Sequence, residues 1–174
     1  MPIRYVLALA VCCIASPAAS YPGRATAPLP EGRLLALSGN SQGASFVAID
    51  QSSMHGGVVD AWVMRVLAEP VVLSSPGEKP EVTVSQTFSH WKVQCAERTA
   101  VELSGDGFDP AGRWRIEGVD IHRPGPPRKI EPNSAQDFLA RVYCDGQQPP
   151  RPVVVVGHAA AVALMQRVKA GPGS

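Results

Sequence analysis

The stretch Thr87–Leu103, TFSHWKVQCAERTAVEL, decides how the sequence is interpreted, because it has the clearest two-residue alternation in the chain. Successive side chains of a strand point to opposite faces, so one parity predicts a buried face and the other a solvated face. The predicted inner parity comprises Trp91, Val93, Cys95, Thr99, Val101 and Leu103. The pattern predicts one half-buried strand with Cys95 facing inward and a bend or bulge at Glu97.

Further strand patterns on both sides extend this strand into a sheet. Residues 33–38, 44–50 and 58–68 precede it, and residues 113–121 follow it after a turn. Four valines and Trp62 in 58–68 favour a strand over the rival helix. We expect residues 71–73 to continue that strand after a break at Pro70. A change of phase across Gly118 predicts a bulge.

One helix is predicted between Ser134 and Cys144. Ser134 has the N-cap residue type, and Asp137 three residues later completes a capping-box pattern. The apolar residues recur at helical spacing and form one stripe: Ala135, Phe138, Leu139, Val142 and Tyr143. A helix this short is unstable alone in water, so it must pack on the sheet.

The first twenty residues have the three-part pattern of a secretory signal peptide. Arg4 precedes the apolar stretch Tyr5–Ile14, and small residues fill Ala15–Ser20. Cleavage is predicted after Ser20, with Ala18 as the second candidate. The apolar stretch is too short to span a bilayer. Two alternatives stay open, a buried N-terminal helix and a lipidated cysteine at Cys12 or Cys13.

Removal of this segment changes the charge and cysteine counts. The mature chain has fifteen basic and fifteen acidic side chains, and Cys95 and Cys144 are its two cysteines. Two cysteines in an exported protein predict one disulfide, with two free buried thiols as the alternative. The predicted fold class is α+β, a mostly antiparallel β-sheet with one short helix packed on it and fastened by that disulfide.

Composition divides the mature chain into three parts. Residues 21–32 form a proline- and glycine-rich flexible leading segment, and residues 33–146 form the α+β domain. Residues 147–174 are a C-terminal extension with a candidate edge strand at 153–156 and a candidate helix at 159–170. No run of like charge predicts a nucleic-acid surface, and the mature chain has no predicted transmembrane span.

The order of these elements resembles the surface-adhesin protein E-like family, small exported proteins of Gram-negative bacteria. The resemblance covers about residues 33 to 145 and rests on four pieces of sequence. These pieces are FVAID at 46–50 followed by SSM at 52–54, AWVM at 61–64, WKVQCAER at 91–98, and PNS at 132–134 leading through Phe138-Leu139 to Tyr143-Cys144.

The resemblance implies a fold and a function. It implies a mostly antiparallel sheet with one helix, and a disulfide that ties the helix end to a central strand at the positions of Cys95 and Cys144. The adhesin that gives the family its name binds extracellular-matrix and plasma proteins, which implies a protein partner outside the cytoplasm.

Chemical motifs are weak throughout the chain. The four histidines lack metal-ligand spacing and are predicted on the surface: His55, His90, His122 and His158. Turn and cap roles are favoured for Asp106, Asp109 and Asp120 over calcium binding. No nucleophile motif or phosphate-binding loop is recognised, so no catalytic, cofactor or metal residue is predicted.

Two groups of residues are considered for binding. Trp62, Trp91 and Trp114 are predicted in the core, with an exposed aromatic strip as the alternative. Arg113 and Arg115 are candidates for a small basic patch together with Arg98.

These observations favour an exported, non-enzymatic protein of the periplasm or cell surface. We expect it to bind a macromolecular partner, an envelope or extracellular protein, through its exposed sheet face or an edge strand. The alternative is an accessory periplasmic domain that contacts envelope proteins through residues 147–174. An enzyme of unrecognised type is a third hypothesis. The sequence predicts neither a cofactor nor the partner-binding residues.

Overall fold

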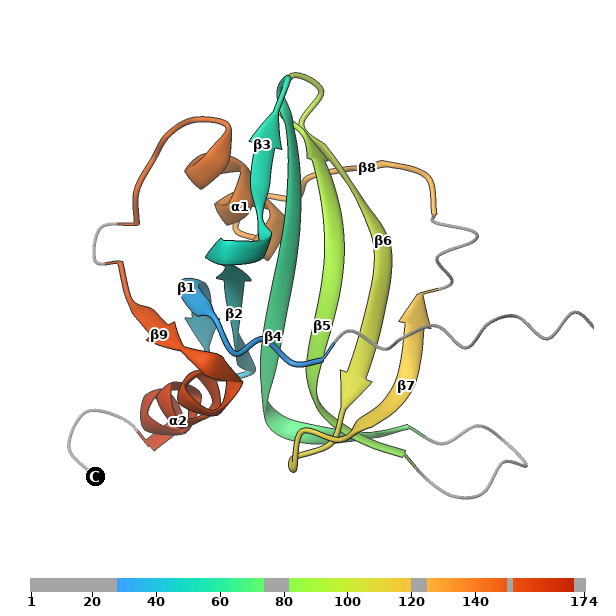
Figure 1. The fold of residues 1–174 in the computed structure, drawn as a ribbon, viewed down its shortest axis with the longest axis vertical. Coiled ribbons are helices and arrows are strands. Elements are labelled where there is room, and N and C mark those ends of the chain that lie inside the picture. The colour runs from blue at the N-terminus through green and yellow to red at the C-terminus, as the bar shows by residue number, and fades with distance from the viewer. Residues whose placement is uncertain (1–27, 74–81, 120–124, 150–151, 171–174) are drawn as a thin grey trace, which may run out of the picture.

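The computed structural model describes residues 28–73, 82–119, 125–149 and 152–170. The predicted signal peptide, residues 1–20, lies outside them. The described residues form nine strands in one sheet, ordered β7-β6-β5-β4-β2-β1-β9, with β3 paired to β4 and β8 to β6. All pairings are antiparallel. The predicted fold class is therefore confirmed, although a second helix joins the first (Figure 1).

Strands β1 to β8 precede the first α-helix along the chain. Their bounds are β1 Arg33–Asn40, β2 Gly43–Ala48, β3 Ser53–His55, β4 Val58–Leu73, β5 Val82–Gln94, β6 Thr99–Phe108, β7 Trp114–Val119, β8 Arg128–Lys129 and β9 Val154–Val156. The helices are η1 Ile49–Gln51, a single 3-10 turn, α1 Ala135–Tyr143 and α2 Gly157–Ala170.

Two apolar cores lie on opposite faces of this sheet. Adjacent residues of β2 contribute to different cores. Phe46 packs in the core under α2, whereas Val47 packs in the core under α1. Both of these side chains are fully buried. We call the two surfaces the α1 face and the α2 face. Figure 1 shows both helices toward the β1, β2 and β9 side of the sheet, with β7 at the opposite edge.

The single strand predicted over residues 87–103 is wrong. β5 ends at Gln94, β6 begins opposite it at Thr99, and a four-residue turn joins them. Arg98 has a left-handed backbone with φ of 50°, which an L residue adopts only at some cost. The carbonyl of Arg98 accepts the Ile130 backbone N–H at 3.0 Å, so a contact distant in sequence supports the turn.

The turn changes which residues share a face. Val93 pairs across the sheet with Ala100, and both are buried in the core under α1. Val101 pairs with Lys92 and so belongs to the other parity. The predicted bulge at Gly118 is confirmed, because β7 skips this residue between Glu117 and Val119 in its register with β6.

Proline does not end β4. The strand continues through Pro70 to Leu73, and its register with β5 shifts between Val66 and Val71. A bulge therefore accommodates the residue that lacks an N–H.

The predicted C-terminal extension is built into the sheet. β9 pairs with β1 as an edge strand, as the pattern at 153–156 predicts. α2 follows it directly and buries Ala161 and Met165 in the core of the α2 face. Residues 153–170 therefore complete one of the two cores rather than standing apart from the domain.

The described end of the leading segment is also packed. Leu29 is 7% exposed, and its side chain belongs to the α2-face core. Backbone hydrogen bonds hold it against α2, since Pro30 and Gly32 accept from His158 and Gly157. The prediction of a flexible segment is wrong for residues 28–32, while residues 21–27 lie outside the described part of the chain.

Candidate functional site: a groove beside helix α1

Helix α1 is fixed at both of its ends. At its C-terminal end, Cys144 forms a disulfide with Cys95, and the two Cα atoms are 5.5 Å apart. The predicted disulfide is therefore confirmed. At its start, the Ser134 hydroxyl accepts the Asp137 backbone N–H at 3.1 Å, as an N-cap does. The Asn133 backbone N–H donates to the Asp137 carboxylate and, more than nearby Arg141, lowers its pKa.

The α1 face divides into an apolar half and a polar half. α1 covers the apolar half, burying Leu139 and Ala140 against Val59 and Val93. Further along the same strands, the side chains that point to the α1 face are polar. Ser45 lies opposite Arg65, and Arg65 lies opposite Thr87 in the next strand. These side chains line the floor of this half, which among the described helices only the start of α1 approaches.

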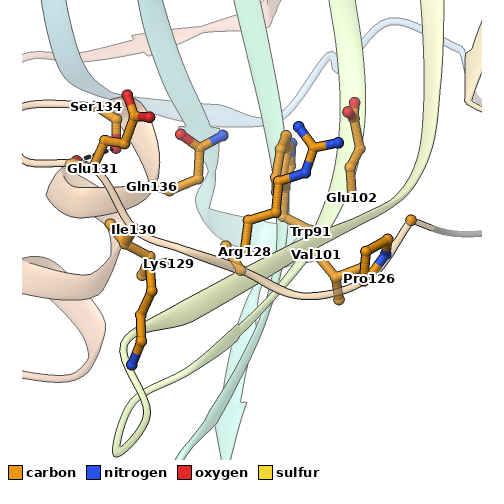
Figure 2. Close-up of a pocket in the computed structure, with 12 residues that line it drawn as sticks. Trp91, Val101, Glu102, Pro126, Arg128, Lys129, Ile130, Glu131, Ser134 and Gln136 are labelled. Atoms are coloured by element: carbon orange, nitrogen blue, oxygen red, sulfur yellow. Dashed lines mark hydrogen bonds between the residues drawn. The ribbon is translucent and has the colours of Figure 1, made fainter.

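Two adjoining cavities lie on this polar half. Figure 2 shows the one that Arg128 lines. Their volumes are about 360 and about 430 Å³. Four residues line both of them: Trp91, Glu102, Ser134 and Gln136. We call the combined hollow the Trp91 groove. It lies across the sheet from the end of β1 to β6, with the start of α1 on one side and β8 on the other.

Glu102 is the titratable group at the centre of the Trp91 groove. It lies directly opposite Trp91 in the β5–β6 register, next to a bulge in β6. Burial raises the pKa of this carboxyl group, and the hydrogen bond from the Ser89 hydroxyl lowers it by less. Gly105 leaves room for this pair, because a Cβ there would lie 2.8 Å from Glu102 Oε1 and 3.0 Å from Ser89 Oγ.

The histidines do not gather at this site. His55 is exposed, and His122 lies outside the described residues. His90 is half-buried on the α2 face, where its Nε2 is 2.6 Å from Asp60 Oδ1 and its ring stacks on Trp62. His158 is half-buried with Nδ1 3.2 Å from Glu31 Oε1. His90 and His158 are thus partly buried rather than fully exposed, and each lies beside a carboxylate distant in sequence.

The aspartates have structural roles where they are described. Asp109 caps the β6–β7 turn, and the backbone N–H of Arg113 contributes most to holding its pKa at about 2. Asp106 is buried and accepts the indole N–H of Trp114 at 3.1 Å. Asp120 lies outside the described residues. The favoured turn and cap role is confirmed for Asp109.

The predicted basic patch is wrong. Arg113 and Arg115 both bind Asp109 beyond the end of β6. Arg98 precedes the start of that strand and binds Asp137 and Asp145. The three guanidinium groups therefore lie at opposite ends of one ten-residue strand, and each is already paired with a carboxylate.

The tryptophans lie in three different places. Trp62 packs against the α2-face core and Trp91 against the α1-face core, both half-buried. Trp114 begins β7 and is 45% exposed. A single aromatic strip is therefore excluded, and the core assignment is confirmed for Trp62 and Trp91 only.

The residues that the structure describes contain no helix long and apolar enough to cross a membrane. Within the same ranges, no three His, Cys, Asp or Glu side chains come together as a metal site would require.

Comparison with known proteins gives structural neighbours at low identity. No family model matches the chain, and no curated protein matches its sequence. One structure of Haemophilus influenzae protein E is similar with a TM-score of 0.46 and 12% identity, covering 69% of this chain and 91% of that chain. Its second crystal form gives 0.47 and 10%, covering 59% and 80%. Membership of the protein E-like family stays a prediction, and no residue role is transferred.

Proposed function

We propose that this chain is an exported, non-enzymatic protein of the cell envelope or surface that binds an extended macromolecule in the Trp91 groove. The observation that carries the proposal is the open polar half of the α1 face. A sheet face of this kind is normally covered or uniformly solvated, whereas here two cavities meet at a half-buried tryptophan.

The shape of the groove favours an extended ligand over a compact one. Thr87 and Trp91 both line it and lie four residues apart on β5, which corresponds to about 13 Å along a strand. The site is half-open to solvent, with its polar groups spread along the strands. Such a surface suits a chain molecule that makes many modest contacts.

A bulky side chain placed inside the groove tests whether the groove is the binding surface. We expect Thr87→Trp to abolish binding to whichever macromolecule the wild-type protein retains from a panel of purified envelope and host-surface proteins and polysaccharides. Lys92→Trp is the matched control, because Lys92 lies on the same strand with its side chain on the α2 face. Binding is measured by surface plasmon resonance, with melting curves to verify that both variants are folded.

The opposite result contradicts the proposal. If Thr87→Trp binds as the wild type does, the groove is not the binding surface. If Lys92→Trp alone loses binding, the partner uses the α2 face instead.

The accessory function predicted for the C-terminal extension is a second candidate. It is favoured by β9, an edge strand whose Val154 and Val156 are 49% and 67% exposed. Exposed apolar edges pair readily with strands of other chains. Deletion of residues 147–174 would not test this candidate, because it would also remove Met165 from the core.

A further inference from the structure

Most arginines that the structure describes form an ion pair with an aspartate, but those that line the Trp91 groove do not. Five arginines bind aspartates: Arg33, Arg98, Arg113, Arg115 and Arg141. Within the described ranges, Arg65, Arg128 and Arg167 have no carboxylate within ion-pair distance. Two of these three, Arg65 and Arg128, line the groove.

The two guanidinium groups belong to different cavities of the groove. Arg65 projects from β4 into the larger cavity, and Arg128 projects from β8 into the smaller one, with Trp91 common to both. Figure 2 shows the head groups of Arg128, Glu102 and Gln136 directed to the same side, whereas Lys129 points away. A guanidinium without a carboxylate partner presents a planar fork of donors that matches sulfate or carboxylate oxygens.

The floor of the larger cavity carries mainly hydroxyl and amide groups. Ser45, Thr87 and Ser89 contribute hydroxyls, and Asn133 and Gln136 contribute amides. Each of these groups both donates and accepts hydrogen bonds, as the hydroxyl groups of a sugar do. Trp91 adds a flat apolar surface on which the C–H face of a sugar ring can stack.

An extended peptide fits this floor less well than a sugar chain. Peptides dock on sheets by pairing with a free edge or by inserting side chains into apolar pockets. The floor is instead the face of paired strands, and the backbone groups of β4 and β5 are engaged in their own ladder. The aliphatic side chains of the larger cavity are Val63 and Ala135, and the smaller cavity adds Ala100, Val101, Pro126 and Ile130.

We propose, on the basis of the proposed function, that the ligand of the Trp91 groove is an anionic polysaccharide, bound by Arg65 and Arg128 and stacked on Trp91. The acidic groups of such a chain replace the carboxylates that the other arginines find within the protein. Because Arg65 and Arg128 line different cavities, each can bind a separate anionic group of the chain.

Glu102 predicts the direction in which the affinity of the groove for an anionic ligand changes with pH. The charged side chains that line the groove are Arg65, Arg128, Lys129, Glu102 and Glu131. Burial raises the pKa of Glu102, so its neutral form is retained to higher pH than for an exposed carboxyl group. An anionic ligand disfavours the charged form further, and binding is therefore expected to strengthen as the pH falls toward the pKa of Glu102.

The test uses a sulfated hexasaccharide, its desulfated counterpart and hexaglutamate as probes, titrated into the full chain by calorimetry. We expect Arg65→Ser and Arg128→Ser each to weaken binding of the sulfated probe about tenfold. Arg167→Ser on α2 is the matched control and should change affinity less than about twofold. Glu102→Gln should bind as tightly as the wild type or more tightly, with a flatter pH profile.

Three results overturn the proposal. They are equal affinity for the desulfated probe, tighter binding of hexaglutamate through the same arginines, and weaker binding by Glu102→Gln. A wrong ligand class can be distinguished from a wrong binding surface. If Thr87→Trp abolishes binding of a macromolecule with which the sulfated hexasaccharide does not compete, the groove is correct and the ligand class is wrong.

Discussion

The Cys144→Ser variant is expected to lose roughly 4 kcal/mol of unfolding free energy relative to the wild type, measured by denaturant titration under oxidising conditions. The disulfide joins residues 49 positions apart, so its loss frees a long loop in the unfolded chain. In the folded chain the same bond fixes the end of α1 to the turn after β5. Its loss therefore also loosens the wall of the Trp91 groove.

Two controls make this expectation specific. Cys95→Ser and the double variant should lose the same amount as Cys144→Ser, because all three remove one bond. Mild reduction of the wild type should reproduce the shift. A loss below about 1 kcal/mol in all three variants would contradict the role of the disulfide in holding α1 on the sheet.

The Met165→Ala variant is expected to lose about 3 kcal/mol of unfolding free energy. Met165 is 2% exposed and packs in the α2-face core, although it lies far into the C-terminal extension. Truncation to alanine leaves a cavity between α2 and the sheet. The measurement is again a denaturant titration, with an unchanged slope as evidence that folding remains cooperative.

Val168→Ala is the matched control for Met165→Ala. Val168 lies three residues further along the same helix, is 50% exposed, and should change stability by less than about 0.5 kcal/mol. If Met165→Ala were as mild as Val168→Ala, α2 would not be part of the core, and residues 147–174 would be separable from the domain.

Local signals in the sequence were sufficient for the sheet and for α1. The β-branched residues of Val58–Ala68 and the capping pattern from Ser134 to Asp137 both predict the element that forms. The two cysteines predict the bond that is present. These elements were predictable because strand propensity and helix capping are local properties, and because two cysteines allow only one pairing.

The β5–β6 turn was not predictable for the opposite reason. Its four residues contain no glycine, proline or asparagine, and alternation continues in the sequence on both sides of it. Arg98 adopts its left-handed conformation with support from Ile130, Asp137 and Asp145. Tertiary contacts, rather than turn residues, therefore determine where β5 ends.

The groove was missed because of the same error. With the turn in place, Trp91 and Glu102 become partners across two strands, whereas a single strand would place them on opposite faces. α2 was hard to place because its alanines do not form one distinct apolar stripe in the sequence. The polar residues Arg65, Thr87 and Ser89 were the available signal, since all three occupy inward positions of central strands.

Oxidative footprinting of the three tryptophans tests the central claim most directly, because each reports on a different surface. Trp91 lines the groove, Trp62 lies on the α2 face, and Trp114 begins β7. The protein is exposed to hydroxyl radicals with and without the macromolecule it binds, and oxidation of each indole is quantified by mass spectrometry. Binding in the groove predicts protection of Trp91 alone. Protection of Trp62 or Trp114 with Trp91 unchanged would contradict it.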